Sequence, residues 1–240
     1  MKILVTGSNG FIAKNLIAHL NRNKKLELYF YKKNDSMDLL EAYVKEADFI
    51  FHLAGVNRPS DKHDFYKGNK DLTQYIVNVL MQNDKSTPVL FSSSIQAIED
   101  NDYGKSKKAA EGILVSYQNT TDAHIFIYRL PNVFGKWSKA NYNSVVATWC
   151  SNIANNLEIQ VSNRNVELAL VYIDDVIKSF IERLTIHTNA QLFEINTVYK
   201  KTLGQIEELL YKFKENRNTL LIPNVASEFE RALYATYLSY

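Results

Sequence analysis

The segment SSSIQAIEDNDYGKSKK, residues 92–108, places a serine, a tyrosine and a lysine at spacings that suit carbonyl chemistry. Tyr103 and Lys107 stand at i and i+4, so on a helix they share one face. The lysine ammonium would favour the phenolate, lower the pKa of Tyr103 from about 10, and hydrogen-bond a nicotinamide ribose. Ser94, at the end of a predicted strand, would hold a substrate carbonyl while Tyr103 protonates its oxygen as hydride arrives at carbon. The trio predicts a catalytic site for oxidoreduction.

A tyrosine and a lysine at this spacing are also common as a surface pair on a helix, so the surrounding elements decide the interpretation. The segment TGSNGFIA, residues 6–13, follows a predicted strand and opens a predicted helix. Gly7 permits a tight turn, Gly10 lets the backbone approach a pyrophosphate, and Ala13 lets helix and strand pack closely. The anion would bind free N–H groups at the helix N-terminus. Small residues also form plain turns, but this context favours a dinucleotide. The residues predicted to contact it here are Gly7, Asn9, Gly10, Phe11 and Ile12.

The end of the second predicted strand indicates which dinucleotide binds. NAD enzymes usually have a carboxylate there that binds the ribose 2′-hydroxyl. In this chain Tyr31 is followed by Lys32 and Lys33, whose ammonium groups would attract a 2′-phosphate. The sequence therefore favours NADPH over NAD. The alternative is that both lysines are solvated loop charges.

Short apolar runs alternate with helix-like stretches through the first two thirds of the chain. The expected strands are 3–5, 26–31, 48–53, 88–92 and 124–128, and the expected helices are 10–21, 39–46, 64–82 and 103–118. This alternation predicts an α/β fold with a Rossmann-type doubly wound parallel sheet. Because the pattern becomes irregular after Gly135, we expect a dinucleotide-binding domain over 1–135 and a smaller lobe over 136–240. The segment near 172–197 is expected to return to the main sheet.

The composition argues against several other classes of function. The 28 Lys and Arg residues nearly balance 26 Asp and Glu residues, so neither nucleic acid nor a membrane surface is an expected partner. A single cysteine, Cys150, rules out an internal disulfide framework and a cysteine-based metal cluster. His52, His63 and His124 lack metal-ligand neighbours and are interpreted as structural or surface residues, so no metal is predicted. The opening MKILVTG shows no secretion signal and no apolar run could span a bilayer, so we expect a soluble, cytoplasmic protein.

Five motifs occur in the order and spacing of the extended short-chain dehydrogenase/reductases, which modify nucleotide sugars. They are TGSNGFIA, HLAG (52–55), SSS (92–94), YGKSK (103–107) and RLPNVFG (129–135). The resemblance covers the whole chain and implies that Ser94, Tyr103 and Lys107 are the catalytic trio. Many relatives have a longer loop between the serine and the tyrosine, but nine residue steps, about 30 Å when extended, can still fold back over the site. Further residues implied to line the cofactor are Leu53, Ala54, Gly55 and, near the nicotinamide, Pro131.

The residues after Ser94 argue against one reaction of this superfamily, dehydration. The 4,6-dehydratases of this superfamily carry an Asp-Glu pair there, whereas this chain has Ile95 and Gln96, which cannot exchange protons in that way. A closer resemblance is to the reductase domain of bifunctional capsular-polysaccharide enzymes. It is carried by HLAGVNRPSDKHDFYKGN, SSSIQAIEDNDYGKSK, FGKWSKANYNSVVATWC and LYATYLSY.

That family uses NADPH to reduce the 4-keto group of a UDP-sugar, giving a UDP-linked 2-acetamido-2,6-dideoxy-L-talose on the way to UDP-N-acetyl-L-fucosamine. The resemblance implies that the smaller lobe binds the UDP-sugar. In the family a C-terminal cupin domain with a metal performs a C3 epimerisation. This chain stops at Tyr240, where the cupin would begin, so we expect neither the epimerisation nor its metal here.

The resemblance also implies substrate contacts and leaves two other functions open. Asn132 would bind the nucleotide-sugar. Arg164 stands where relatives place an arginine on the UDP diphosphate, although it could equally be an exposed loop arginine, and Arg58 is a candidate for phosphate or sugar contact. The alternatives are an NAD-dependent UDP-sugar 4-epimerase with the same trio and a non-catalytic NADPH-binding sensor or scaffold. By family analogy we expect a homodimer through helices 64–82 and 103–118.

Overall fold

The computed structural model describes residues 1–240 apart from residues 60, 186–187, 189, 222 and 225. The described chain forms two compact units. Unit 1 comprises Met1–Leu130 and Ile177–Glu194, and unit 2 comprises Pro131–Val176 and Ile195–Tyr240. Within the described residues, no helix is both long enough and apolar enough to cross a bilayer.

The boundary between the units differs slightly from the one placed by sequence. The sequence put it after residue 135, whereas the structural division follows Leu130. Leu130 is the last residue of the main sheet to pair there, opposite Ser94, and Pro131 lacks the N–H group that a further ladder bond would need. The segment expected to return near 172–197 is assigned to unit 1 over residues 177–194. Residues 186, 187 and 189 of that segment lie outside the described residues.

Unit 1 is built on a parallel sheet. Its strands among the described residues are β1 (Lys2–Thr6), β2 (Glu27–Tyr31), β3 (Phe49–His52), β4 (Val89–Ser94), β5 (Ile125–Leu130) and β8 (Leu192–Phe193). They pair in the order β2-β1-β3-β4-β5-β8, and each of these pairs is parallel. The winding direction therefore reverses between β1 and β3. In open α/β sheets, ligands bind in the crevice beyond the carboxyl ends of the strands at such a reversal.

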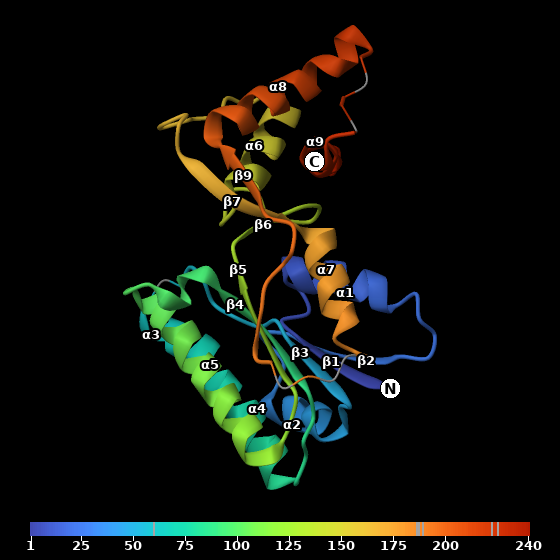
Figure 1. The fold of residues 1–240 in the computed structure, drawn as a ribbon, viewed down its shortest axis with the longest axis vertical. Helices are drawn as coiled ribbons and strands as arrows, with labels where there is room; N and C mark the ends of the chain where they lie inside the picture. Colours follow the sequence, from blue (N-terminus) through green and yellow to red (C-terminus); the bar gives the residue numbers. More distant parts are fainter. Residues whose placement is uncertain (60, 186–187, 189, 222, 225) are drawn as a thin grey trace. The chain divides into compact units, whose positions relative to one another are not determined.

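Helices cover both faces of this sheet, which confirms the predicted Rossmann-type doubly wound fold. Figure 1 shows α1 and α7 on one face and α2, α4 and α5 on the other. The helical elements of this region are α1 (Phe11–Leu20), α2 (Met37–Glu46), α3 (His63–Phe65), the π-helix η1 (Tyr66–Asp71), α4 (Leu72–Gln82), the 3₁₀-helix η2 (Ile95–Ile98), α5 (Asp102–Thr121) and α7 (Ile173–Glu182), whose second half belongs to unit 1.

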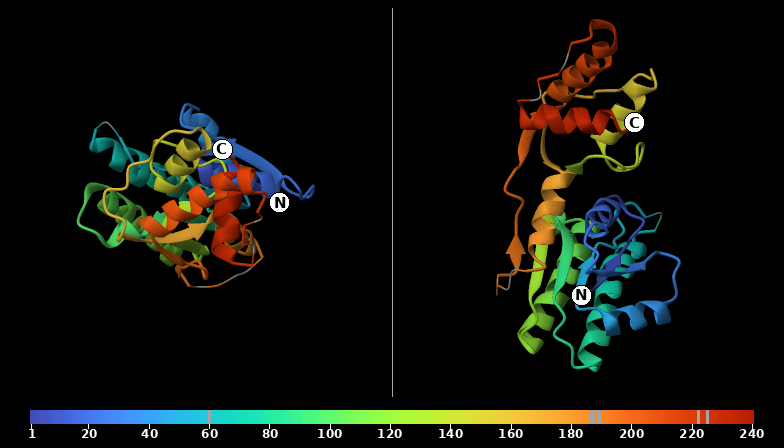
Figure 2. Two further views of the ribbon diagram at one scale, coloured as in Figure 1. Left: turned by 90° about the horizontal axis from the view of Figure 1, so that it is seen from above. Right: turned by 90° about the vertical axis from the view of Figure 1, so that its right-hand side faces the viewer.

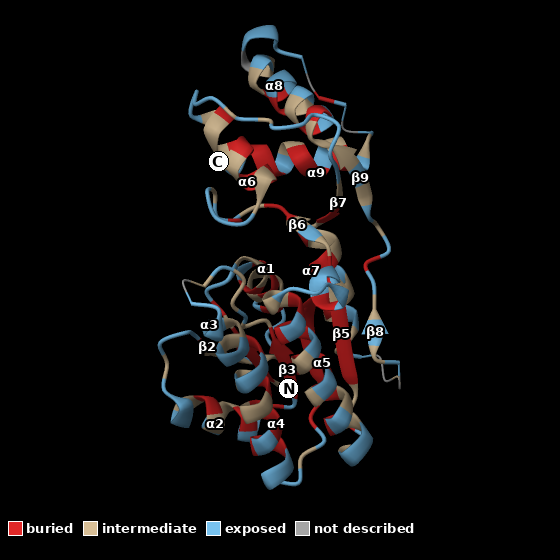
Figure 3. Cartoon of the chain, turned by 90° about the vertical axis from the view of Figure 1, so that its left-hand side faces the viewer, coloured by how far each residue is buried: buried red, intermediate tan, exposed pale blue. Residues whose placement is uncertain are grey.

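Alternate strand residues fill the two faces of the sheet. Leu4 of β1 and Ile50 of β3 join the core formed with α2, α4 and α5, whereas Phe51 of β3 stacks on Phe180 of α7, with ring centroids 6.4 Å apart. Every residue of β3 and β4 is buried, and Figure 3 shows β3 in the colour of buried residues. Parallel strands covered on both faces are expected to be continuously apolar, so the polar residues His52, Ser92 and Ser94 at their carboxyl ends stand out.

The helix expected over 64–82 is not regular in the structure. It is divided into α3, the π-helical turn η1 and α4. The apolar positions predicted for packing do face the core on α4, where Ile76 and Leu80 are buried. A π-helical turn accommodates an extra residue and is often found at functional sites. Within it, Asn69 is completely buried.

Unit 2 is smaller and combines a short mixed sheet with three helices in its described part. The strands are β6 (Asn132–Phe134), β7 (Glu167–Tyr172) and β9 (Tyr199–Thr202), and the helices are α6 (Val145–Ala154), α8 (Leu203–Thr219) and α9 (Glu228–Tyr237). β6 is parallel and β9 antiparallel to the central β7. Phe134, Trp149, Leu210 and Phe229 share one buried cluster, so sheet and helices have a common core. Figure 2 shows the three helices together.

Candidate active site

The first part of the site is the turn that joins β1 to α1. Gly7 has a φ of +66°, and a β-carbon there would lie 2.7 Å from the Ala54 Cα. A side chain would be strained by this left-handed conformation and would also collide with the backbone of the neighbouring loop. The Gly10 N–H donates to the Gly7 carbonyl at 2.8 Å, and Gly10 starts α1 without a side-chain cap. An anion can therefore take the place of the cap, which fits a pyrophosphate.

The other residues predicted for this turn surround it in the structure. Asn9 is exposed, and Phe11 and Ile12 form the half-buried first turn of α1. The Ser8 N–H and hydroxyl both reach the Tyr31 carbonyl, at 3.1 and 3.3 Å. This contact joins the end of β2 to the turn, as a dinucleotide site requires.

The two lysines after β2 are exposed, and a carboxylate lies beside them. Asp35 accepts a hydrogen bond from the Lys32 backbone N–H at 2.8 Å, and Lys33 is exposed next to it. The sequence analysis missed Asp35 because it looked for an acid at the end of the strand, whereas Asp35 comes from the turn that follows. The charges that would meet the adenosine ribose are thus mixed, not purely basic.

The loop after β3 closes over the same edge of the sheet. The Ala54 N–H donates to the Thr6 hydroxyl at 3.2 Å, and Leu53 and Ala54 are the residues that crowd Gly7. A β-carbon on Gly55 would lie 3.0 Å from the Lys107 Nζ. The loop therefore brings the predicted cofactor residues Leu53, Ala54 and Gly55 between the phosphate turn and Lys107.

Ser94 ends β4 and starts the short helix η2. Its Oγ accepts the Gln96 N–H at 3.2 Å, so Ser94 is the N-cap of that helix. The hydroxyl still has its own proton to donate, and its interaction with the Tyr103 side chain acts to lower the pKa of the phenol, which burial raises. Ile95 and Gln96, which occupy the positions of the dehydratase acids, are exposed.

Gly104 explains how Tyr103 reaches Ser94 across the short connection. A β-carbon on Gly104 would collide with the Gln96 carbonyl oxygen and lie 2.9 Å from the Glu99 carbonyl oxygen. The glycine thus lets the first turn of α5 pack directly on η2. Asn101 fixes the start of α5, because its side chain accepts the Gly104 N–H at 2.7 Å. The Tyr103 ring also contacts that of Phe65, at 5.7 Å between centroids.

The protonation of Tyr103 corrects one expectation. The sequence predicted that Lys107 would lower the pKa of the phenol, but in the structure burial raises the pKa of Tyr103, and the hydrogen bond with Ser94 only partly opposes this. The reason is that the lysine ammonium is directed elsewhere: its Nζ donates to the Ser92 carbonyl at 2.9 Å. Tyr103 is therefore a phenol with a proton to give at neutral pH.

Lys107 is almost completely buried, with 4% of its surface exposed. Burial lowers the pKa of this ammonium to about 8, and the nearby Glu111 carboxylate opposes the shift. Its Nζ also lies 4.7 Å from the centre of the Phe91 ring. Glu111 is held in turn by Arg129, whose Nε and Nη2 donate to its two oxygens at 2.9 and 2.6 Å. Lys107 is thus a positive charge with a fixed position at the end of β4.

Two buried polar residues at the site were missed by the sequence analysis. The Asn69 amide donates to the Ser106 hydroxyl at 2.9 Å, and Ser106 donates to the Tyr103 carbonyl at 2.7 Å. Asn69 also exchanges two hydrogen bonds with the backbone of Val56, at 2.9 and 3.0 Å. Ser106 lies within YGKSK and Asn69 ends HLAGVNRPSDKHDFYKGN, but the sequence assigned neither a role, because the burial of Asn69 in the π-helical turn is a feature of the fold.

The predicted substrate residues Arg58 and Asn132 are both exposed. Arg58 is exposed in the loop after β3. Pro131 follows β5 directly, and Asn132 is exposed at the start of β6, where its amide donates to the Ala169 carbonyl at 3.4 Å. Pro131 and Asn132 belong to unit 2 and Arg58 to unit 1.

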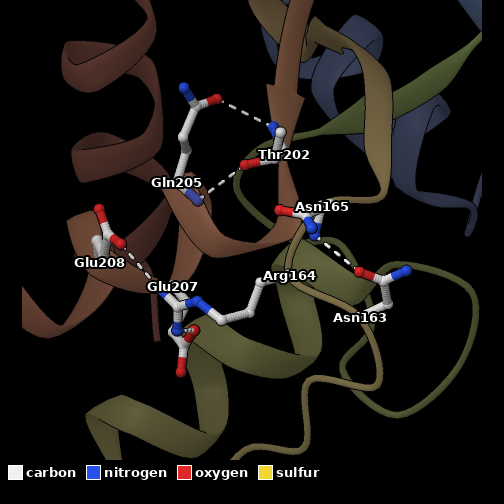
Figure 4. A network of polar contacts seen from close by, with 7 residues as sticks. All are labelled: Asn163, Arg164, Asn165, Thr202, Gln205, Glu207 and Glu208. Atoms are coloured by element: carbon white, nitrogen blue, oxygen red, sulfur yellow. Dashed lines mark hydrogen bonds and ion pairs between the residues drawn. The ribbon is translucent and has the colours of Figure 1, made fainter.

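Arg164 is engaged by two carboxylates of unit 2. Its guanidinium pairs with Glu207 and, at 2.7 Å, with Glu208 (Figure 4). Gly204, in the first turn of α8, lies so close to Arg164 that a β-carbon would be 3.2 Å from the arginine Nε. About half of the Arg164 side chain, 51%, stays exposed. A diphosphate at this position would have to share the guanidinium with two acids.

The comparisons with known proteins identify the family of this chain and support its fold. Residues 3–195 match the NAD dependent epimerase/dehydratase family. The chain belongs to that family, and a nicotinamide dinucleotide is accordingly its cofactor. A UDP-glucose 4-epimerase of Thermotoga maritima shares the fold, with a TM-score of 0.83 at 18% identity over the whole of this chain and 98% of the other.

Two relatives with higher sequence identity have names that specify a reaction or a process. The chain is 44% identical, over its full length and 65% of the relative's, to a UDP-2-acetamido-2,6-beta-L-arabino-hexul-4-ose reductase of Pseudomonas aeruginosa. It is 43% identical to the capsular polysaccharide assembling protein CapF of Staphylococcus aureus, with a TM-score of 0.91 over all of this chain and 66% of that one. The chain thus spans just under two thirds of the length of these relatives.

Proposed function

We propose that this chain is an NADPH-dependent reductase of the C4 keto group in a UDP-linked 4-keto-6-deoxy-N-acetylhexosamine. The product would serve as a precursor of capsular or other surface polysaccharide. One observation carries the proposal: Gly104 packs the first turn of α5, with Tyr103, directly on the helix that Ser94 starts, and a buried Lys107 lies beside Gly55 of the cofactor loop. The full-length similarity to a protein named as a UDP-sugar 4-ose reductase supports the choice of reaction.

The residues around the phosphate turn would hold the dinucleotide. Its pyrophosphate would bind the first N–H groups of α1, at a turn where a side chain on Gly7 would meet the next loop. Leu53, Ala54 and Gly55 would lie along the nicotinamide half, with Pro131 nearby. The cradle at Gly7 and Gly55 fits such a ligand because neither position has room for a β-carbon.

The trio would perform the proton chemistry of the reduction. Bound at this edge of the sheet, the reduced nicotinamide supplies the hydride. Ser94 would donate its hydroxyl proton to the substrate carbonyl while its Oγ accepts the Gln96 N–H. Tyr103, kept protonated by burial, would give its proton to the same oxygen. Lys107, whose Nζ lies beside Gly55 of the cofactor loop, would hydrogen-bond the nicotinamide ribose.

Unit 2 would bind the UDP-sugar. Asn132 is exposed at the start of β6 and would contact the nucleotide-sugar. Arg164 would reach the diphosphate while Glu207 and Glu208 orient its guanidinium. Arg58, in the loop that carries the cofactor residues, would contact phosphate or sugar.

Preference for NADPH rests on Lys32 and Lys33, with Asp35 as the opposing charge. Changing both lysines to alanine is expected to weaken NADPH binding on the order of tenfold, because two ammonium groups near a 2′-phosphate are lost. NADH binding should not change. Calorimetric titration of both cofactors measures the difference. Equal losses for the two cofactors would contradict a 2′-phosphate contact.

We also propose a homodimer through α4 and α5, as in the family. Both helices pack side by side on the sheet and carry partly buried apolar residues, among them Tyr75 and Ile113. Sedimentation velocity at micromolar concentration is expected to give a dimer. A monomer would contradict this assembly without affecting the reaction.

The decisive experiment mixes the purified chain with NADPH and the UDP-4-keto sugar. The proposal predicts loss of the reduced-nicotinamide absorbance and a UDP-sugar heavier by two hydrogens in mass spectrometry. Interconversion of the sugar without net NADPH consumption would indicate a 4-epimerase instead. Tight NADPH binding with an unaltered sugar would indicate a sensor or scaffold.

A further inference from the structure

His52, at the carboxyl end of β3, lies at the centre of a buried set of hydrogen bonds. Its Nδ1 is 2.8 Å from the Thr6 Oγ1, and its Nε2 is 2.9 Å from the Thr73 Oγ1. None of the three side chains is exposed to solvent. The imidazole thus links β1 and β3 to the start of α4.

The neighbouring bonds decide which ring nitrogen carries the proton. The Thr73 hydroxyl donates to the Asn69 carbonyl at 2.6 Å, so its oxygen must accept from the Nε2–H of His52. The Thr6 hydroxyl accepts the Ala54 N–H at 3.2 Å and is left to donate its own proton to Nδ1. A single tautomer, protonated on Nε2, satisfies all of these bonds.

The chain of donors therefore runs in one direction, from the cofactor loop to the π-helical turn. It continues on the far side of Asn69, whose amide donates to Ser106, and Ser106 donates to the Tyr103 carbonyl. The same amide holds both polar groups of the Val56 backbone. Asn69 is thus the joint between the loop that faces the nicotinamide and the backbone of the tyrosine.

We propose that His52, with its proton on Nε2, is a positioning residue that couples the loop 53–56 to Tyr103 through Thr73, Asn69 and Ser106. It touches neither substrate nor cofactor. It fixes the distance between the loop that holds the nicotinamide and the tyrosine that delivers the proton. The proposal rests on the proposed reductase function for its kinetic consequence, but the tautomer and the bond network stand apart from it.

The surroundings keep the imidazole uncharged. Burial and the nearby Lys107 ammonium lower the pKa of His52 to about 3, and the ring stacks on Phe91 with centroids 5.4 Å apart. Lys107 is the charged group that acts on it. A second proton, on Nδ1, would face the Thr6 hydroxyl, which would then have to accept two bonds. The hydrogen bonds from Ala54 to Asn69 would then no longer all have their donors on the same side.

Thr73 offers the cleanest test because valine has the same shape as threonine without the hydroxyl. In Thr73→Val the Nε2–H loses its acceptor and the Asn69 carbonyl loses a donor. We expect kcat to fall on the order of ten- to a hundredfold, with the KM for the UDP-sugar and the Kd for NADPH unchanged. Thr73→Ser, which keeps the hydroxyl, should restore most of kcat. Thr87→Val controls for the loss of a buried threonine hydroxyl, since the Thr87 hydroxyl donates to the Ala47 carbonyl at the opposite end of the sheet.

A spectroscopic measurement tests the tautomer without any turnover. Long-range ¹H–¹⁵N correlation spectra of the NADPH-bound protein should show His52 as the Nε2–H tautomer, unchanged between neutral and mildly acidic pH. An Nδ1–H or cationic ring would overturn the proposal. So would a Thr73→Val enzyme with normal kcat, or a serine variant that fails to restore it.

The two proposals can fail separately. If the wild-type protein reduces no UDP-4-keto sugar, the function is wrong, and the spectra of the NADPH-bound protein still test the tautomer on which the relay depends. In that case, a wild-type spectrum in which His52 is not the Nε2–H tautomer would count against the relay alone.

Discussion

Two polar networks of this protein differ in their access to water. In unit 1, His52 and Asn69 have no exposed surface and Lys107 has 4%. In unit 2, 51% of the Arg164 side chain and 71% of that of its partner Glu208 are exposed. An unmade bond in the dry network leaves a desolvated group without a partner, whereas water replaces a lost partner at the surface. The first network can therefore fix geometry, and the second supplies mainly charge.

Removing the phenol oxygen at the edge of the buried network should have the largest effect. Tyr103→Phe is expected to lower kcat on the order of a thousandfold, because the proton donor is lost. NADPH affinity should not change, since the phosphate turn is untouched. Steady-state kinetics and cofactor titration separate the two quantities.

Tyr117→Phe is the matched control, on the same helix but with its hydroxyl on the Lys85 and Thr87 carbonyls. It is expected to lose stability and keep its turnover. Unchanged turnover in Tyr103→Phe would contradict the assignment of the proton donor.

The buried ammonium gives the next effect, on stability as a function of pH. Because the pKa of Lys107 falls from 10.5 to about 8 on folding, the unfolded chain binds more protons between these values. The lysine therefore lowers the free energy of unfolding below pH 8, and this penalty is relieved as the pH rises toward 10.5. Relative to Lys107→Met, the wild-type protein should gain as much as about 3 kcal/mol over that interval.

Urea unfolding of both proteins at several pH values measures this difference. Lys108→Met, one position further along the helix and exposed, controls for the general loss of one lysine. A wild-type minus Lys107→Met difference that stays constant with pH would show that Lys107 is solvated.

The packing that delivers Tyr103 to Ser94 gives a smaller effect. Gly104→Ala should destabilise the protein by about 1–3 kcal/mol, because the new methyl group overlaps the Gln96 carbonyl. Gly112→Ala, on the same helix with nothing within 4 Å of its β-carbon, should instead stabilise by up to about 1 kcal/mol. Thermal unfolding compares them. Equal effects would mean that α5 does not need its close contact with η2.

The exposed network should show the smallest change in stability. Arg164→Ala is expected to alter the free energy of unfolding by only about 0.5 kcal/mol, because both ion pairs are partly solvated. If the guanidinium also binds the diphosphate, KM for the UDP-sugar should rise about tenfold. A KM equal to that of the wild-type enzyme would leave Arg164 with a structural role only.

The sequence predicted the fold well where local pattern and packing agree. The alternation of strands and helices, the end of β2 at Tyr31 and the start of α1 after Gly10 are all present in the structure. These features follow from short-range rules: apolar runs of strand length, glycine at a tight turn and apolar positions at helical spacing. The break in the helix expected over 64–82 was not predicted: Gly68 weakens a helix at this place, but a glycine does not by itself specify a π-helical turn.

The sequence by itself determined which groups are available: a phosphate turn, a serine, a tyrosine and a lysine in a fixed order along the chain. Only the tertiary structure decided how those groups behave. It turned the Lys107 ammonium onto the Ser92 carbonyl, so that burial and not the lysine controls the pKa of Tyr103. It also brought Asn69 and His52 into the site, two residues that lie within the quoted motifs but to which the sequence assigned no functional role. Desolvation and hydrogen-bond direction depend on neighbours that are distant in sequence, so they exist only once the sheet has assembled.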